Sequence, residues 1–316
     1  MKHSWKKLLS TALFAVMIVL LAWYLYDNRA DLSQLLTLSP GIVAAMFLFG
    51  LGACTMNCLY HKLILDTYDI QLGLVDWMGV VFVANAMAFV LPMRADLIFT
   101  ATYYRRTKGL AYVKSASIAA GNIVFSVMFA LIQMAAALVC TGLIEGQWPG
   151  LLWLILVCMA GAVALFLVVA LWFGDRMPAF LSRIKIVRDV VSGFNELLRN
   201  RALLAKLLGC LIVNNLLHLL LYMACFRGVG MEVTLYQALF YNSISRLCTL
   251  VAIVPGNLGI KQAVMGVAGS LMGDVFQSSV MVSLLQSVTL MVVYIIMGGA
   301  FAYPVWKRWN RAEGLK

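Results

Sequence analysis

Charged residues are scarce in this 316-residue chain: 12% of the sequence is charged, whereas 63% is apolar. Soluble globular domains contain about 25% charged and about 45–50% apolar residues. The scarcity excludes a sizeable catalytic domain outside a membrane, a secreted disulfide scaffold and a disordered tail. Acidic residues are the fewest, 13 against 24 basic ones. We expect the resulting charge of +11 to report membrane topology rather than nucleic-acid binding.

Motifs of catalysis and metal binding are also missing. The sequence contains no Gly-rich phosphate loop, no Gly-x-Ser-x-Gly motif and no set of His, Cys and Glu at metal-ligand spacing. The seven cysteines are scattered through apolar stretches, and the close pair Cys54 and Cys58 is joined by no second pair. Free cysteine packs as a small hydrophobe. We therefore expect neither an enzyme nor a protein with a metal or another cofactor.

Long apolar runs are what the sequence has in abundance. A membrane-spanning helix needs about 20 apolar residues. Apolar runs occur at 8–26, 41–60, 72–91, 115–142, 151–174, 203–226, 235–254, 260–273 and 275–303. The first run follows three lysines and resembles a signal peptide, but its aromatic end at 23–26 offers no small-residue cleavage site. We expect it to be a retained anchor helix.

Basic residues decide which runs cross the membrane, because Lys and Arg gather on the cytoplasmic side. Both termini and the segment 175–206 are rich in them, whereas 145–149 has none. A full crossing by 72–91 would leave the next cluster of basic residues outside. We therefore predict a re-entrant hairpin over about 72–112, the first hairpin, that enters from the cytoplasm. By the same reasoning a second hairpin over about 235–273 enters from outside and turns at a Pro-Gly break.

The predicted fold is an all-α polytopic membrane protein with six full transmembrane helices and two re-entrant hairpins in one membrane domain. Residues 1–142 make three crossings and one hairpin, so residues 143–316 repeat this arrangement upside down. Inverted repeats with broken helices that meet near the midplane are typical of secondary transporters. An amphipathic helix is predicted over about 177–199, where its basic face would attract anionic lipid. A plain connector between the halves is the alternative.

Ionisable residues within apolar segments are candidates for function, because each costs about 2.5–3.5 kcal/mol to insert into hydrocarbon. Arg94 and Asp96 lie at the first tip, Lys261 lies just past the second, and Arg246 and His218 lie in apolar helices. At each tip a helix restarts after a proline, and its N-terminus favours an anion. Arg94 and Lys261 beside two such N-termini suit a phosphate.

The candidate residues fall into two groups. We assign a headgroup or phosphate site to Arg94, Lys261, Arg246, Asn257, Asn85 and Asn242. We assign coupling or charge balance to Asp96, Gln262 and His218. Structural roles stay open for all of them: Arg94 pairing with Asp96, Arg246 binding backbone carbonyls, the asparagines joining helices, and His218 packing.

The two tip segments resemble the lysylphosphatidylglycerol synthase transmembrane-region family of flippase-like integral membrane proteins. The resemblance is carried by Asn85, 91–96, 103–112, Arg246 and 254–263. Members show a proline, a basic residue, a glycine and an acidic residue at the first tip. At the second they show a PGG- or PGN-type turn followed by a basic residue and glutamate. In this sequence no glycine stands between Ala95 and Asp96, and Phe99 replaces the arginine that often follows the first tip. At the second tip, Gln262 replaces the glutamate.

The resemblance implies transfer of a phospholipid or related amphiphile between leaflets, without the soluble aminoacyl transferase domain that some members carry. We expect a lipid translocase of a bacterial inner membrane with both termini cytoplasmic. Its expected partners are an anionic amphiphile and the bilayer, not nucleic acid. Two alternatives stay open: a coupled transporter of a small water-soluble anion, and a non-transporting partner of an envelope-lipid enzyme. Assembly as a homo-oligomer or with such an enzyme also stays open.

Overall fold

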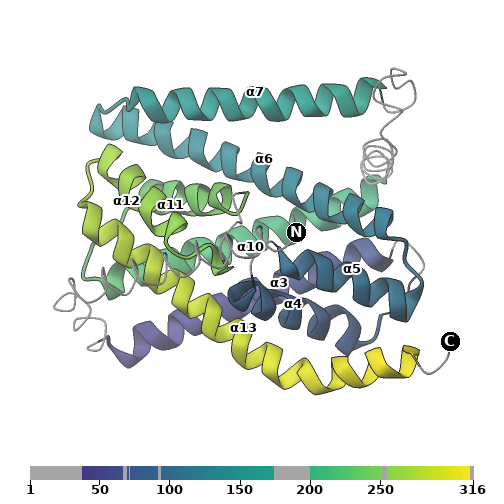
Figure 1. Cartoon of the computed structure of the whole chain (residues 1–316). Helices are drawn as coiled ribbons and strands as arrows, with labels where there is room; N and C mark the ends of the chain where they lie inside the picture. The colour runs from purple at the N-terminus through teal and green to yellow at the C-terminus, as the bar shows by residue number, and fades with distance from the viewer. Residues whose placement is uncertain are drawn as a thin grey trace, which may run out of the picture.

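The computed structural model describes residues 38–66, 70, 72–91, 94–173, 200–250 and 255–313, and within these ranges the chain is helical and contains no strand. Its elements, in chain order, are α3 (Pro40–Asp66), a π-helical turn η1 (Val75–Gly79), α4 (Val80–Val90), α5 (Ala95–Lys108), α6 (Tyr112–Glu145), α7 (Gly150–Phe173), α10 (Arg201–Gly228), α11 (Leu235–Cys248), a 3-10 turn η2 (Pro255–Asn257), α12 (Ile260–Leu271) and α13 (Phe276–Glu313). Figure 1 shows their arrangement.

Five of the described helices are long and apolar enough to cross a membrane: α3, α6, α7, α10 and α13. They confirm the prediction of an all-helical integral membrane protein. In Figure 1 these five run in the same general direction across the molecule. The predicted crossing at 8–26 and the predicted amphipathic helix at 177–199 lie outside the described residues.

Two pairs of short helices lie between the long ones. The first hairpin consists of α4 and α5, with 11 and 14 residues, and the second of α11 and α12, with 14 and 12. Each helix is shorter than the roughly 20 residues of a spanning helix. In Figure 1 the first hairpin occupies the end of the bundle that holds the C-terminus, and the second occupies the opposite end. The helix breaks fall where the sequence places its two turns, while re-entry into a membrane and the inverted repeat stay predictions.

The tips of the two hairpins touch in the middle of the molecule. Gly256 in η2 packs against Phe89 at the end of α4, and a Cβ atom there would lie 2.6 Å from Phe89 Cδ1. Gly256 also has a φ of 60°, a conformation that favours glycine. Close approach of the tips therefore depends on this glycine.

Local signals in the sequence account for the helix ends. Asn200 caps α10, since its Oδ1 accepts the Leu203 N–H at 3.0 Å. Thr234 and Gln237 form a reciprocal capping box at the start of α11. Gly109, with a φ of 72°, ends α5 in a left-handed turn.

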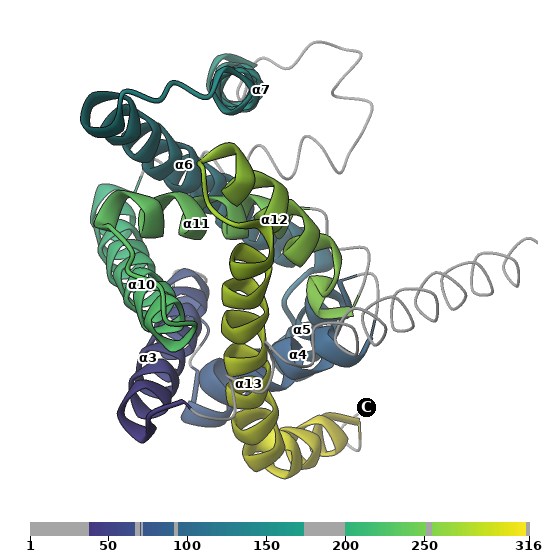
Figure 2. The same ribbon diagram turned by 90° about the vertical axis from the view of Figure 1, so that its left-hand side faces the viewer.

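Apolar packing forms one large cluster around each hairpin. The cluster at the second hairpin buries aromatic side chains of α10 and α11, among them Tyr222, Phe226, Phe240 and Tyr241. The cluster at the first hairpin joins α3, α5, α10 and the end of α13. By contrast, α7 lies beside α6 at the edge of the bundle, as Figures 1 and 2 show, and only 11% of its apolar window is buried.

The base of the first hairpin is fastened by Asp76, whose side chain is 2% exposed. Its carboxylate accepts hydrogen bonds from Tyr103 at 2.9 Å and Arg308 at 2.7 Å, and pairs with Lys108 at 3.0 Å. Burial by itself would raise the pKa of Asp76, but the bonds from Lys108, Arg308 and Tyr103 outweigh it and hold that pKa below its usual value. The carboxylate thereby joins α5 to the C-terminal part of α13.

Aromatic stacking reinforces the same junction. Trp309 of α13 stacks on Phe99 of α5, with ring centroids 5.8 Å apart, and the Arg106 guanidinium lies 4.7 Å from the centre of the Trp309 ring. Phe99 thus packs against the C-terminal helix.

A candidate anion-binding cavity below the hairpin tips

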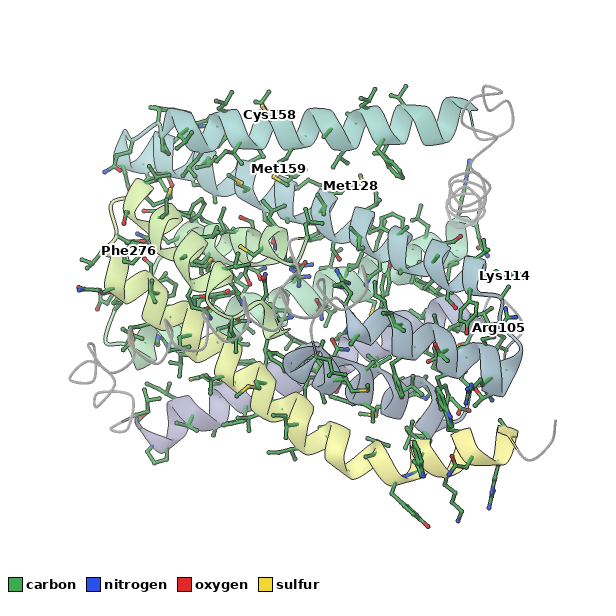
Figure 3. The ribbon with its side chains drawn as sticks, in the orientation of Figure 1. Arg105, Lys114, Met128, Cys158, Met159 and Phe276 are labelled. Carbon is green, nitrogen blue, oxygen red and sulfur yellow. The ribbon has the colours of Figure 1, made fainter. Side chains whose placement is uncertain are left out.

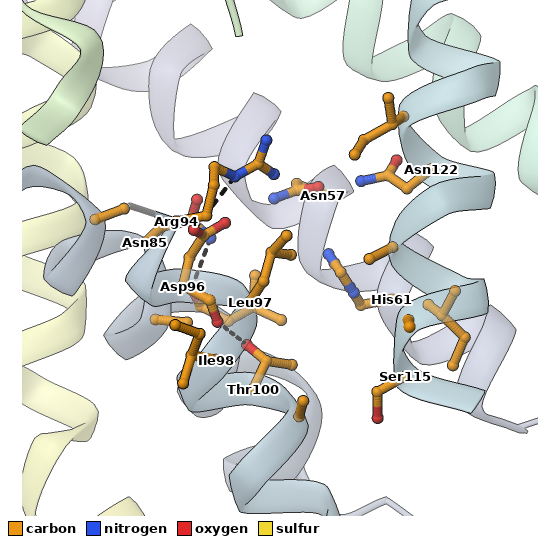
Figure 4. Close-up of a pocket in the computed structure, with 18 of the residues that line it drawn as sticks. Asn57, His61, Asn85, Arg94, Asp96, Leu97, Ile98, Thr100, Ser115 and Asn122 are labelled. Carbon is orange, nitrogen blue, oxygen red and sulfur yellow. Dashed lines mark hydrogen bonds and ion pairs between the residues drawn. The ribbon is translucent and has the colours of Figure 1, made fainter. Parts of the chain in front are cut away.

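A cavity of about 910 Å³ lies beside the first hairpin and reaches the tips of both hairpins (Figure 4). Its volume falls within the range of small-molecule sites, about 300–1,000 Å³. Most of the lining is apolar and comes from α3, α4, α5 and α6. The polar side chains in the lining are Asn57, His61, Asn85, Arg94, Asp96, Thr100, Thr102, Tyr104, Tyr112, Ser115, Asn122, Thr249, Asn257 and Tyr294.

Arg94 stands at the start of α5 in an uncommon backbone conformation. Its φ is 55°, and among the described residues Asn257, at 54°, is the only other non-glycine residue with a positive φ. The left-handed conformation costs an ordinary residue about 1–2 kcal/mol, so the surrounding structure must hold it in place. The two residues lie at the tips of the two hairpins. Figure 4 shows the Arg94 side chain extending into the cavity towards Asn57.

The guanidinium of Arg94 is held only loosely. Its Nε lies 3.5 Å from Asp96 Oδ1, and its Nη1 donates to the Thr249 carbonyl oxygen at 3.4 Å. Charge-assisted hydrogen bonds are usually about 2.7–2.9 Å long. Neither contact uses Nη2, and the side chain is 33% exposed. The guanidinium can therefore turn its fork towards an anion in the cavity.

The N-terminus of α5 adds to the positive potential at this end of the cavity. No side chain caps the helix there. Its first backbone N–H groups and the positive end of its dipole therefore face the tip, where they favour an anion. Asp96 lies in the first turn of the same helix and offsets part of the Arg94 charge. An anion bound at the tip would be stabilised by Arg94 and the helix end together.

Asn85 and Asn257 also contribute to the cavity wall. Asn85 Nδ2 donates to the Val81 carbonyl at 2.8 Å. Asn257 Nδ2 donates to the Cys248 carbonyl at 2.6 Å, which ties the second tip back to the end of α11. The Oδ1 atom of Asn257 is buried without a hydrogen-bond partner. Buried acceptors are usually satisfied, so this oxygen is available to a hydroxyl or ammonium group of a ligand.

The remaining predicted binding residues lie outside the cavity lining. Lys261 follows the first residue of α12 and points towards α13, where its Nζ donates to Gln286 Oε1. Arg246 Nη2 donates to Asn214 Oδ1 at 2.7 Å. Asn242 joins helices, because its Nδ2 donates to Gln133 Oε1 at 3.1 Å. Four of the predicted residues therefore line one cavity: Arg94, Asn85, Asn257 and Asp96. The lining does not include Lys261, Arg246 or Asn242.

Gln262 closes the N-terminus of α12. Its Oε1 accepts the Gly259 N–H at 2.7 Å, and its Nε2 donates to Ser287 Oγ at 3.4 Å. The two tips therefore differ: the start of α5 is uncapped, whereas the start of α12 already has an acceptor. His218 does not line the cavity either, and lies within electrostatic reach of Arg246 and Lys261.

Three polar residues opposite Arg94 were not assigned to the site from the sequence. Asn57 and Asn122 lie within the apolar runs 41–60 and 115–142, where a lone asparagine is typical of interhelical hydrogen bonding, and His61 follows the first of these runs. Figure 4 shows Asn57 and His61 on α3 and Asn122 on α6, all facing the cavity. Asn57 and His61 are four residues apart and so lie on one face of α3. Two polar residues at this spacing in an apolar helix are the signal in the sequence that could have pointed to a polar cavity wall.

Comparison with protein-family models gives a match over most of the chain. The family model described as "Lysylphosphatidylglycerol synthase TM region" matches residues 8–298. No curated protein and no solved structure matches the chain.

Proposed function

Since the chain belongs to the lysylphosphatidylglycerol synthase transmembrane-region family, we propose that it is a membrane lipid translocase. It moves a phospholipid, or another amphiphile that carries phosphate, between the leaflets of a bacterial inner membrane. The observation that carries the proposal is Arg94, a loosely held guanidinium at the tip end of a largely apolar cavity. The chain's own chemistry is binding and release, with no bond made or broken in the lipid.

The proposed membrane placement follows from helix length and charge. The five long helices and the run at 8–26 cross the bilayer, and the two hairpins enter from opposite sides. Arg105 and Lys114 lie at the end of the bundle that holds the C-terminus (Figures 1 and 3), and basic residues there favour a cytoplasmic placement of that end. Both termini then lie in the cytoplasm, and residues 1–142 and 143–316 form inverted halves.

The headgroup phosphate binds at Arg94 and the uncapped start of α5, next to Asn85 and Asn257. Arg94 supplies the fork of donors that suits phosphate oxygens. Asp96 keeps Arg94 in place when no ligand is bound, through the contact at 3.5 Å. Exchange of this weak partner for a phosphate lets the headgroup bind without leaving the Arg94 guanidinium unpaired.

The acyl chains leave the cavity between α5 and α6. Ile98 of α5 and Tyr112 of α6 line the cavity and are 66% and 48% exposed, so the cavity reaches the surface between these two helices. Apolar side chains dominate the lining there. A lateral apolar opening favours a lipid over a small water-soluble anion, which would need a closed polar tunnel.

The test is transfer of fluorescent NBD-labelled phosphatidylglycerol in proteoliposomes, followed by dithionite quenching. We expect Arg94→Gln to slow transfer at least tenfold while the variant stays folded, because the phosphate loses its charged donor. Arg227→Gln, which removes an exposed arginine at the end of α10, is the matched control and keeps the wild-type rate. Unchanged transfer in Arg94→Gln would refute the site. Absence of transfer by the wild type, together with a stoichiometric co-purifying enzyme, would favour the non-transporting partner.

A further inference from the structure

The wall of the cavity opposite Arg94 carries three polar side chains that the proposed phosphate site leaves unused. Asn57 and His61 stand on α3 and Asn122 stands on α6, and Figure 4 shows all three facing the cavity. Each of them is only partly exposed. A polar group in a largely apolar wall is costly unless it has a hydrogen-bond partner. The partners that these side chains lack therefore indicate what the cavity binds.

The polar atoms of this wall are available to a ligand. Among the described residues, no hydrogen bond involves the His61 ring or the Asn122 amide. Asn57 lies within hydrogen-bond reach of the Tyr294 hydroxyl, which belongs to the same lining. Because an amide has two donor hydrogens and an acceptor oxygen, Asn57 keeps further capacity for a ligand.

The hydrogen-bonding capacity of this wall is neutral and mixed. An amide and a neutral imidazole each offer at least one donor and one acceptor, and a hydroxyl group can bond to both. Of the residues that line the cavity, the ionised ones are Arg94 and Asp96, and both belong to the tip of the first hairpin. An ammonium group placed against α3 would therefore lack the carboxylate that a buried cation requires.

The position of the wall fits the free side of a bound phosphodiester. The headgroup alcohol and the acylated glycerol are esterified to the same phosphorus, so they leave a bound phosphate in different directions. In the proposed complex the acyl chains pass between α5 and α6. Figure 4 shows α3 behind the space between these two helices, and the Arg94 side chain extends towards Asn57 on α3. The alcohol of a lipid bound at Arg94 thus faces α3.

We propose that His61, Asn57 and Asn122 form a headgroup subsite that selects lipids whose phosphate carries an uncharged, hydroxylated alcohol such as glycerol or another polyol. This inference rests on the proposed function, because the phosphate at Arg94 sets where the alcohol lies. The hydroxyls of the alcohol bond to the imidazole and to the two amides. An alcohol without further hydroxyls leaves these polar atoms unpaired, and one with an ammonium group leaves a charge uncompensated.

The test compares the transfer of three lipids with identical acyl chains, one of them NBD-labelled, in the dithionite assay at pH 8, where histidine is neutral. Phosphatidylglycerol and phosphatidylpropanol have the same net charge and a three-carbon headgroup, but only phosphatidylglycerol carries headgroup hydroxyls. Phosphatidylethanolamine presents an ammonium group. We expect the wild type to move phosphatidylglycerol about tenfold faster than phosphatidylpropanol, the usual consequence of losing one or two neutral hydrogen bonds. Phosphatidylethanolamine should also be slower than phosphatidylglycerol.

Two results with the wild type would overturn the subsite. Equal transfer of phosphatidylglycerol and phosphatidylpropanol would show that the hydroxyls are not bound. Fastest transfer of phosphatidylethanolamine would assign the headgroup to the carboxylate of Asp96 instead. Neither result depends on a variant, so the proposal can be refuted even if a variant fails to fold.

Variants assign the preference to this wall. His61→Leu and Asn122→Leu should each slow phosphatidylglycerol towards the phosphatidylpropanol rate and leave the phosphatidylpropanol rate nearly unchanged. His61→Gln keeps a donor and an acceptor and should retain most of the preference. Asn310→Leu makes the same change at an exposed position of α13 and is the matched control, with wild-type rates. Equal slowing of all three lipids by the leucine variants would show a structural role and overturn the subsite.

Arg94→Gln separates this inference from the phosphate site on which it rests. The variant should slow all three lipids, whereas the leucine variants change the preference among them. Slow transfer in Arg94→Gln without any headgroup preference in the wild type would refute the subsite alone. If the wild type moves no lipid, thermal unfolding in detergent decides: phosphatidylglycerol should raise the midpoint more than phosphatidylpropanol does, because a ligand that binds the folded state stabilises it. Equal midpoints would overturn the subsite.

Discussion

At the scale of single residues, the strongest constraint outside the cavity is the carboxylate of Asp76. It receives two cations and a tyrosine hydroxyl within 3.0 Å. Replacement of Asp76 by asparagine keeps a polar side chain of similar size in the buried site but removes the negative charge. Lys108 and Arg308 then lose the group that holds α5 to the end of α13. The effect should therefore appear in stability and in the docking of the C-terminal segment.

We expect Asp76→Asn to destabilise the protein by about 1.5–3 kcal/mol, the usual range for a hydrogen bond to a charged group. The measurement is thermal unfolding in detergent. Asp66→Asn is the control, because its partner Lys62 forms an exposed i,i+4 pair and such pairs contribute about 0.3–0.5 kcal/mol. If Asp76→Asn and Asp66→Asn destabilised the protein equally, the buried contacts of Asp76 would contribute no more to stability than the exposed pair.

The comparison of the wild type with Asp76→Asn also predicts how the stability difference between them depends on pH. The pKa of Asp76 is lower in the folded state than its usual value of 3.8, so its stabilising contribution is complete above that value. The contribution disappears as the pH falls through the lower folded-state pKa. The stability difference between wild type and Asp76→Asn should be constant from pH 5 to pH 8 and shrink below pH 4. A difference that grew on acidification would contradict the sign.

Residue-level reasoning on the sequence singled out both Arg94 and Lys261, and the structure places Arg94, but not Lys261, in the lining of the cavity. A cation next to a proline break in an apolar run is conspicuous whatever the fold, which is why Arg94 stood out. The direction of Lys261 depends on which helix packs against the first turn of α12, and α13 takes that position. Asp76 was missed for a related reason, since its partners lie 27, 32 and 232 positions away in the chain.

At the scale of elements, the two helix breaks could be predicted, because proline and glycine act locally. The chain leaves α4 after Val90 and resumes at Ala95, and it leaves α11 after Cys248 and resumes at Ile260. The cavity could not be predicted in the same way. It depends on the separation of α5 and α6, which follows from tertiary packing and not from any pattern within either helix.

The wall that α6 contributes to the cavity gives a test of the proposed acyl path. Ala119 lines the cavity, whereas Ala136 lies exposed on the same helix. We expect Ala119→Trp to slow lipid transfer at least tenfold, because the indole fills space between α5 and α6. Ala136→Trp adds the same ring outside the cavity and should keep the wild-type rate. Both rates come from the dithionite assay.

A second cargo distinguishes a lipid path from a solute path. If the protein carries a water-soluble anion, liposomes loaded with glycerol phosphate should release it through the wild type. A protein that releases glycerol phosphate but moves no labelled lipid would support the alternative transporter. Slow lipid transfer in both tryptophan variants would point to a general effect of bulk on α6 and would refute the assigned path.

At the scale of the whole molecule, the proposed transport requires the inverted halves to move against each other. Contacts between the halves occur at the hairpin tips, where Arg94 Nη1 reaches the Thr249 carbonyl, and along α4 and α13. Gly79, just before α4, lies against Phe301 of α13, and a Cβ on Gly79 would be 3.2 Å from Phe301 Cβ. Disulfides need Cβ atoms about 3.5–4.5 Å apart, so a cross-link can form here after a small adjustment.

A disulfide between Gly79→Cys and Phe301→Cys should therefore stop transfer by holding α4 of one half against α13 of the other. The Phe301 change also removes the ring that would crowd the new side chain at position 79. We expect transfer to be lost under oxidising conditions and to return when the bond is reduced. The single variant Phe301→Cys under the same oxidant controls for oxidation of the native cysteines. Full transfer by a quantitatively cross-linked protein would mean that α4 and α13 move as one body. The moving boundary between the halves would then have to lie elsewhere, along α3 and α10 or along α6 and α11.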